Sequence, residues 1–294
     1  MILIPAPAKV NLCLAVRGRR LDGFHDIDSV ALIIDWHDLI GIRLRPAAST
    51  AVRLRVTGGD GSTPQGDDNL VAVAARAVAA VAGPLAADLW LDKRVPSEAG
   101  LGGGSSDAAG VLRGCAALIG AGALGPDRAA TLDGPGLLAL AVSLGSDVPM
   151  LVAGGAQRMR GRGEMLTALR APALHLAVAI VGASSTAATY AAVERVDCEG
   201  DARADGVAAA LQAGESPADD QLGSGLEAAA CRANPALGAR LVGLRAAVSE
   251  VRWHLTGSGG AAFALADSGR RAEELASAAR QAGFPARACR SVDG

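Results

Sequence analysis

The sequence is poor in aromatic residues and in lysine. Its 294 residues include one Tyr, three Phe and three Trp, although half of the residues are apolar. The chain can therefore bury a large core, which must consist mainly of Ala, Val and Leu, and any exposed aromatic side chain becomes informative. Lys9 and Lys93 are the only lysines, so both are candidates for a specific role.

Other absences exclude whole classes of function. No basic run is present and the formal net charge is −2, so the electrostatic footprint of a nucleic-acid-binding protein is missing. The five cysteines are far apart and without metal-ligand spacing, which is typical of reduced thiols in a cytoplasmic protein. No signal peptide is indicated, and the longest uncharged stretch, residues 171–193, contains Pro172 and Gly182. That stretch predicts a buried strand rather than a membrane span.

Hydrophobic patterns predict a mixture of strands and helices. Strands are expected over residues 10–16, 27–34, 39–44, 52–56, 89–95, 174–181, 251–256, 261–266 and 285–290. Helices are expected over residues 69–82, after 107, around 137–143 and over 268–282. Because the two types do not alternate regularly, the pattern favours an α+β fold with antiparallel sheets covered by helices. A boundary near Gly154-Gly155 divides the chain into domains of residues 1–154 and 155–294.

The strongest local signal is Pro-Ser-Glu-Ala-Gly-Leu-Gly-Gly-Gly-Ser-Ser-Asp at residues 96–107, between a predicted strand and a predicted helix. Its glycines let the backbone approach a ligand closely. The N–H groups at the start of the helix favour a bound anion. Ser105 and Ser106 can cap the helix or reach a phosphate or Mg²⁺. The alternative is a loop with serine caps and Asp107 at the helix dipole.

A second glycine turn, Leu-Thr-Gly-Ser-Gly-Gly-Ala, occupies residues 255–261. It mimics a dinucleotide-binding fingerprint, but a strand is predicted to follow it where that fingerprint requires a helix. The segment therefore predicts a tight hairpin-like turn, which either is structural or lines a site.

Three polar groups have both a structural and a functional interpretation. Lys9 lies beside Asn11 on one surface of the first strand, His25 follows a turn, and Asp147 precedes a proline. They can be a surface charge, a satisfied polar group and a turn residue, or they can act together. Spacing along the sequence leaves both interpretations open.

Together these segments resemble the three motifs of the GHMP kinases, in the expected order across nearly the whole chain. The motifs are residues 5–12 (Pro-Ala-Pro-Ala-Lys-Val-Asn-Leu), 96–107 and 255–263. Asp-Gly-Phe-His at 22–25 and Gly-Ser-Asp-Val-Pro at 145–149 resemble the branch that phosphorylates a cytidine diphosphate-linked polyol. The resemblance implies an ATP-binding N-terminal domain and a ferredoxin-like C-terminal domain. It also implies a cytoplasmic monomer or homodimer with a small-molecule substrate and no nucleic-acid or membrane partner.

The resemblance also implies individual roles, with ATP and Mg²⁺ as cofactors. Lys9 and Asp147 flank the substrate hydroxyl as catalytic residues. Phe24 stacks on cytosine, and His25 reads the edge of the base. The other substrate-binding residues are Asn11, Gly257, Ser258 and Gly259. The residues around ATP are Asn69, Leu70, Lys93, Gly100, Leu101, Gly102, Gly103, Gly104, Ser105 and Ser106, and Ser106 is the candidate metal ligand.

Three segments depart from the family pattern. Phe24 stands where Tyr is usual, Val181-Gly182 where Pro-Gly is usual, and Ser224-Gly225 where Asn-Asp is expected. Other hypotheses are a GHMP kinase for homoserine, mevalonate or a sugar, a non-catalytic ligand sensor, and a dinucleotide oxidoreductase. The aromatic–histidine pair favours a nucleobase-bearing substrate, and the presence of both Lys9 and Asp147 favours an enzyme over a sensor.

Overall fold

The computed structural model describes residues 1–125, 132–198 and 202–292. They form two compact units, each made of separate stretches of chain. Unit 1 consists of Met1–Ala8, Trp36–Ser97 and Gly102–Ala153, and unit 2 consists of Lys9–Asp35, Glu98–Leu101 and Gly154–Gly294. Strands β1 (Ile2–Arg19) and β2 (His25–Pro46) run through both units. The division into domains 1–154 and 155–294 stays a prediction.

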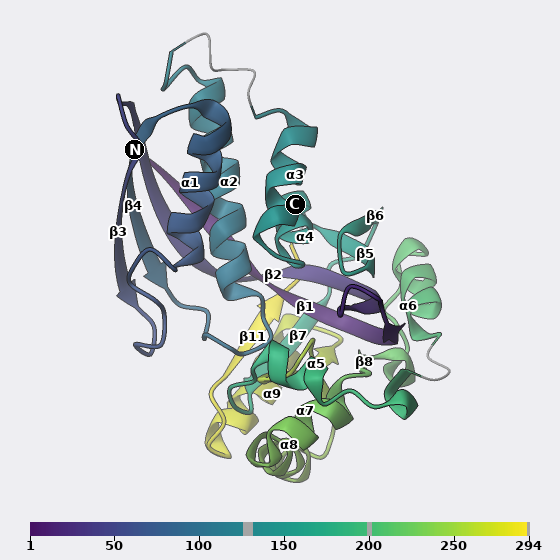
Figure 1. Cartoon of the computed structure of the whole chain (residues 1–294). Coiled ribbons are helices and arrows are strands. Elements are labelled where there is room, and N and C mark those ends of the chain that lie inside the picture. Colours follow the sequence, from purple (N-terminus) through teal and green to yellow (C-terminus); the bar gives the residue numbers. More distant parts are fainter. Residues whose placement is uncertain (126–131, 199–201, 293–294) are drawn as a thin grey trace. The chain divides into compact units, whose positions relative to one another are not determined.

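Within the described part of unit 1, a sheet combines with helices α1 to α4 (Figure 1). Its strand order is β3-β4-β2-β1, in which β3 is parallel to β4 and β4 is antiparallel to β2. Helix α2 packs beside α1 and also contacts α3 and α4. The further elements of this unit are β3 (Ala51–Gly58), α1 (Leu70–Ala82), β4 (Leu85–Lys93), α2 (Gly103–Gly120), α3 (Gly134–Leu144) and α4 (Val148–Ala153).

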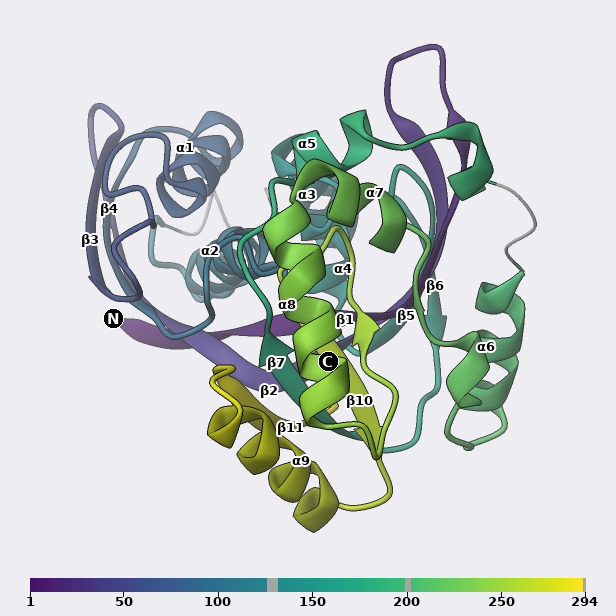
Figure 2. The same ribbon diagram turned by 90° about the horizontal axis from the view of Figure 1, so that it is seen from below.

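Unit 2 contains a four-stranded antiparallel sheet in the order β11-β7-β10-β9. Helices α8 and α9 cover one face of this sheet and share its hydrophobic core (Figure 2). In the same unit, β2 pairs with β5, β5 with β6, and β1 with β8. Its further elements are β5 (Ala156–Gly161), β6 (Met165–Leu169), β7 (His175–Ile180), α5 (Thr186–Ala191), η2 (Arg195–Cys198), α6 (Arg203–Gln212), η3 (Asp219–Gln221), β8 (Gly223–Ser224), α7 (Glu227–Ala233), α8 (Pro235–Ala247), β9 (His254–Leu255), β10 (Ala261–Ala266), α9 (Gly269–Gln281) and β11 (Ala286–Arg290).

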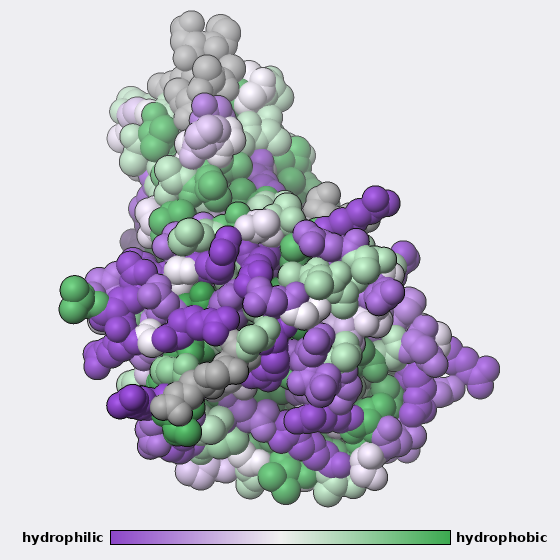
Figure 3. Space-filling model, turned by 90° about the vertical axis from the view of Figure 1, so that its right-hand side faces the viewer, coloured by the Kyte–Doolittle hydropathy of each residue, from purple (hydrophilic) through white to green (hydrophobic). Residues whose placement is uncertain are grey.

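The buried side chains are mainly Ala, Val, Leu and Ile, as the composition predicts, with Trp253 and Phe263 as the largest fully buried residues. Hydrophilic side chains cover most of the face drawn in Figure 3. Within residues 1–125, 132–198 and 202–292, no helix has the length and apolar character that a membrane span requires.

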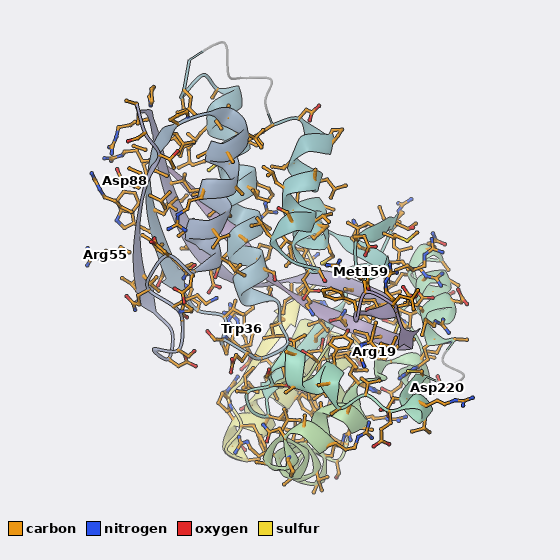
Figure 4. The ribbon with its side chains drawn as sticks, viewed as in Figure 1. Arg19, Trp36, Arg55, Asp88, Met159 and Asp220 are labelled. Atoms are coloured by element: carbon orange, nitrogen blue, oxygen red, sulfur yellow. The ribbon has the colours of Figure 1, made fainter. Side chains whose placement is uncertain are left out.

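Most of the predicted elements are confirmed, including the helix capped by Asn69 and the strand over residues 261–266. The expectation of two strands over 27–34 and 39–44 is wrong, because β2 continues through both. Figure 4 labels Trp36 in the joining segment, where its indole Nε1 donates to the Arg94 carbonyl at 2.9 Å. Polar groups in this segment thus have tertiary partners, which the sequence pattern does not reveal.

Candidate active site

The first motif places Lys9 and Asn11 side by side on β1. Both are buried, with 4% and 2% of their surface exposed. Lys9 Nζ donates to Asn11 Oδ1 at 2.6 Å, and Asn11 Nδ2 donates to Ser29 Oγ at 2.8 Å. Because a buried ammonium group requires polar partners, these contacts exclude the interpretation of Lys9 as a solvated surface charge.

The glycine turn between β9 and β10 lies directly against this pair. Asn11 N donates to Thr256 Oγ1 at 2.8 Å. A Cβ atom added to Gly257 would lie 3.2 Å from Lys9 Nζ and 3.0 Å from Asn11 Oδ1, and Gly257 has a φ of 57°. Both the close approach and the left-handed backbone favour glycine at this position. The turn therefore lines the Lys9 site, and the strand β10 that follows it excludes a dinucleotide fingerprint.

Ser224, a departure from the family pattern, anchors the same turn. Its Oγ donates to the Gly257 carbonyl at 2.6 Å and accepts a bond from Leu226 N at 3.1 Å. A single hydroxyl thus joins β8 to the glycine turn. The replacement of Asn-Asp by Ser-Gly is therefore compatible with an ordered turn.

The start of the glycine-rich segment approaches the turn as well. A Cβ atom on Gly100 would lie 2.3 Å from the Gly259 carbonyl oxygen, and Lys9 N donates to Leu101 O at 2.9 Å. Within unit 2, the structure thus brings together seven residues that the sequence marks as site residues. They are Lys9, Asn11, Gly100, Leu101, Gly257, Ser258 and Gly259.

In unit 1, helix α2 begins without a side-chain cap. Gly102 holds the N-cap position with a φ of 69°, and no side chain accepts a bond from the first turn. The first backbone bond of the helix runs from Ser106 N to Gly102 O. The N–H groups of Gly103, Gly104 and Ser105 therefore have no partner within the helix, and such a helix start favours a bound anion. The serine caps that the alternative interpretation expected are absent from this helix start, and phosphate binding here stays a prediction.

Ser106 is fully buried, and its Oγ donates to the Pro7 carbonyl at 2.6 Å. Its role as a metal ligand stays a prediction. Among the residues that the structure describes, no group of three or more His, Cys, Asp or Glu side chains could hold a metal ion. This is compatible with Mg²⁺, which takes most of its ligands from water and phosphate and needs only one or two side-chain oxygens.

Of the three other residues expected near ATP, two lie at the start of α2. Leu70 Cδ1 would lie 3.6 Å from a Cβ atom on Gly104, and Lys93 Nζ would lie 3.0 Å from one on Gly103. Asn69 caps α1 through its Oδ1, which accepts from Val71 N at 2.8 Å. Leu70 and Lys93 thus contact the glycine segment, whereas the side chain of Asn69 is used in the helix cap.

The ammonium group of Lys93 belongs to a buried ion cluster. Nζ lies 2.5 Å from Asp38 Oδ2 and 3.0 Å from Asp107 Oδ2, and all three side chains are at most 3% exposed. Burial lowers the pKa of Lys93, but the two carboxylates outweigh burial and raise it. Burial raises the pKa of Asp107 well above its ordinary value. Asp38, which the sequence does not mark, accepts a further bond from Val95 N at 2.8 Å.

Asp147 lies in unit 1, immediately before α4. Its carbonyl accepts the bond from Leu151 N at 3.2 Å, so it begins the first turn of that helix. Its side chain is half-buried. Helix α4 packs against α2 and α3, which fixes the position of Asp147 within the unit.

Phe24 and His25 each have an aromatic or cationic neighbour in unit 2. The guanidinium group of Arg162 lies 3.8 Å from the centre of the Phe24 ring. The His25 ring stacks on Tyr190 with 5.3 Å between centroids and 29° between planes. Burial lowers the pKa of His25, and positively charged Arg19, labelled in Figure 4 at the end of β1, lowers it further. A neutral imidazole offers one donor and one acceptor to a ligand.

Tyr190 and Arg162 were missed by sequence reasoning. A signal for Tyr190 exists, because it is the only tyrosine of an aromatic-poor chain and follows Val181-Gly182 closely. No such signal exists for Arg162, since arginine is abundant and the contact depends on how β5 pairs with β2.

The comparisons with known proteins agree with the motifs. Residues 69–155 match the GHMP kinases N terminal domain. The chain is 37% identical to a 4-diphosphocytidyl-2-C-methyl-D-erythritol kinase of Polaromonas sp., over 89% of this chain and 82% of the relative. It is 38% identical to the kinase of that name from Deinococcus radiodurans, over 94% of this chain and 88% of the relative.

A solved structure supports the same assignment at the level of the fold. The crystal structure of a 4-(cytidine 5'-diphospho)-2C-methyl-D-erythritol kinase superposes with a TM-score of 0.79, is 34% identical and covers 100% of both chains. Both the expected α+β fold and the expected kinase class are thereby confirmed. The chain belongs to the GHMP kinase family, in its group of 4-diphosphocytidyl-2-C-methyl-D-erythritol kinases.

Proposed function

We propose that the protein transfers the γ-phosphoryl group of ATP to the 2-hydroxyl of 4-diphosphocytidyl-2-C-methyl-D-erythritol. The products are ADP and the 2-phosphate, a step of the non-mevalonate isoprenoid pathway. The observation that carries the proposal is the buried Lys9–Asn11 pair beneath the Gly257 turn. This arrangement joins two of the family motifs in a chain whose relatives bear that kinase name.

The uncapped start of α2 is the proposed phosphate site. Its free N–H groups and the positive end of the helix dipole favour the triphosphate. Leu70 beside Gly104 supplies an apolar surface for the nucleoside. Lys93 keeps the glycine segment ordered and does not bind ATP directly, because its ammonium group is already paired with Asp38 and Asp107.

Lys9 and Asp147 are the proposed catalytic residues. Phosphoryl transfer passes through a loose transition state, so catalysis depends mostly on positioning and on neutralising charge. The Lys9 ammonium group stabilises the charge on the attacking oxygen, and Asn11 fixes its direction. Asp147 orients the hydroxyl and takes its proton as the bond to phosphorus forms and ADP leaves. Mg²⁺ bound together with the triphosphate would supply further neutralisation of the phosphate charge.

The cytosine ring is proposed to lie among Phe24, His25 and Tyr190. Phe24 is 48% exposed, so its ring has surface available for stacking. Stacking of a base on an aromatic side chain contributes about 1–3 kcal/mol. Neutral His25 reads the base edge, and Tyr190 supplies a second wall. A cytoplasmic location and a monomeric or homodimeric state stay predictions.

The test is an ADP-release assay with ATP, Mg²⁺ and each of four alcohols. The alcohols are 4-diphosphocytidyl-2-C-methyl-D-erythritol, homoserine, mevalonate and galactose. We expect turnover with the cytidine-bearing alcohol alone, and its loss in Asp147→Asn. Turnover with another alcohol and none with the first would reject the substrate but retain the kinase class. ATP binding without turnover of any alcohol would instead favour a sensor.

A further inference from the structure

Arg162 lies on the turn between β5 and β6, beside the loop that carries Phe24. The register explains this neighbourhood, because Gly161 pairs with Ile27, three residues after Phe24. The guanidinium carbon lies 3.8 Å from the centre of the Phe24 ring, so it covers one face of the ring. Since 48% of Phe24 remains exposed, the ring retains surface for a ligand.

The turn that carries Arg162 is itself fixed. Arg162 N donates to Glu164 Oε2 at 2.6 Å. Gly161 and Gly163 have φ values of 68° and 115°, and a Cβ atom on Gly161 would lie 2.7 Å from the Glu164 carboxylate. The carboxylate therefore lies close over the turn, which limits the orientations available to the Arg162 backbone.

The backbone of Phe24 is held by hydrogen bonds to neighbouring residues of its own loop. Phe24 O accepts from Arg20 N at 2.7 Å and Phe24 N donates to Asp22 Oδ1 at 3.2 Å. Its ring, unlike a tyrosine ring, has no hydroxyl that could be anchored by a hydrogen bond. The nearby cation Arg20 is paired with Asp22 and Asp26. The stacked guanidinium group of Arg162 lies directly on the ring and restricts its rotation.

We propose that Arg162 is a positioning residue of the base site, which holds the Phe24 ring as a rigid platform for the nucleobase. The guanidinium compensates for the hydroxyl that this chain lacks at position 24. This inference rests on the proposed function, and it adds a specificity determinant that lies outside the three motifs. A rigid platform lowers the entropic cost of base binding without acting on the phosphoryl-transfer step.

The first test compares Arg162→Gln with Arg160→Gln, which removes one exposed arginine from the same hairpin and so controls for the loss of charge. We expect Arg162→Gln to raise the KM for the cytidine-bearing alcohol about three- to fivefold, as loss of an exposed cation–π contact implies. The kcat and the KM for ATP should stay within about twofold of the parent. An unchanged KM in Arg162→Gln would overturn the proposal. An equal rise of KM in Arg160→Gln would overturn it as well, because the loss of one positive charge would then explain the effect without the ring contact.

The second test is a double-mutant cycle with Phe24. In a Phe24→Leu background the effect of Arg162→Gln should vanish, and in a Phe24→Tyr background it should shrink. A full effect in the Leu background would show that Arg162 acts without the ring and would overturn the proposal. Titration calorimetry with cytidine 5′-monophosphate measures the same coupling without turnover. It therefore tests Arg162 even if the alcohol assay rejects the proposed function.

Discussion

Asp38, Lys93 and Asp107 place two carboxyl groups around one ammonium group in the interior of unit 1. Asp107 Oδ1 is buried and has no hydrogen-bond partner among the described residues. Burial raises the pKa of Asp107, and the neighbouring Asp38 charge adds to that rise. Both effects favour the protonated form of the Asp107 carboxyl group more strongly in the folded protein than in the unfolded chain.

The raised pKa of Asp107 makes the free energy of unfolding depend on pH. A carboxyl group whose pKa is raised by folding contributes its full stabilisation at pH values below its ordinary pKa of 3.8. The contribution is lost as the pH rises through the raised pKa. The side chain of Asp107→Asn does not titrate. The variant should therefore gain stability relative to the parent protein as the pH rises above about 4. Urea unfolding between pH 4 and 8 measures this difference, and parallel curves for the two proteins would contradict it.

Lys9 permits a second prediction at this scale. Lys9→Met removes the charge while conserving length, and it leaves Asn11 Oδ1 without its 2.6 Å donor. We expect kcat to fall by a factor on the order of 10² or more, with little change in the KM for ATP. Steady-state kinetics measure both, and a thermal melt controls for unfolding. Near-parental turnover would remove Lys9 from the catalytic proposal.

Residues within the motifs were predictable because their types are unusual in this chain. Lys9 is one of two lysines, and Gly257 lies in a run of glycines. Their proximity was not predictable, because it depends on pairing between segments almost 250 residues apart. The stacking of Tyr190 on His25 and the ion pair of Asp38 with Lys93 were not predictable either, because both also join separate segments of the chain.

At the scale of elements, helix α2 contacts the sheet of unit 1 through two glycines. A Cβ atom on Gly110 would lie 2.7 Å from Ile40 Cδ1, and one on Gly114 would lie 2.5 Å from Ile42 Cδ1. The two positions are four residues apart and lie on one face of the helix. The missing side chains thus allow the helix that begins at the proposed phosphate site to lie close to β2.

Gly114→Ala should consequently destabilise the protein by about 1–3 kcal/mol through overpacking. Gly120→Ala is the matched control, because its added Cβ atom meets nothing within 4 Å in the same helix. The control should be neutral or slightly stabilising, by less than about 1 kcal/mol. Equal free energies of unfolding for the two variants in urea would show that α2 has room to move away from the sheet.

Strands with strict alternation, such as residues 52–56 in β3, were predictable because one face is half-buried and the other is exposed. The joining segment of β2 was not, because Trp36 and Asp38 are polar or amphipathic and yet buried. Their partners, the Arg94 carbonyl and Lys93, lie in a remote part of the sequence. The short β8 and β9 have too few residues to show a period.

At the scale of the whole molecule, each unit depends on separate stretches of chain. In unit 2, β5 pairs with residues 27–32 of β2, and β8 pairs with Cys13 and Leu14 of β1. A fragment of residues 155–294 would lack both partner strands. We expect it to be unfolded or molten by near-ultraviolet circular dichroism and amide-proton dispersion, whereas the full chain is folded. A cooperatively folded fragment would contradict this dependence and would support 155–294 as an independent domain.

The scarcity of lysine has a practical consequence for measuring motion. The two lysines are each 4% exposed, and Lys9 belongs to unit 2 whereas Lys93 belongs to unit 1. An amine-directed acylating reagent reaches either side chain only when its surroundings open. Mass spectrometry of the two acylated peptides would therefore time the opening of each unit separately in the unmodified chain. Nucleotide and alcohol could then be added one at a time to find which unit each of them closes.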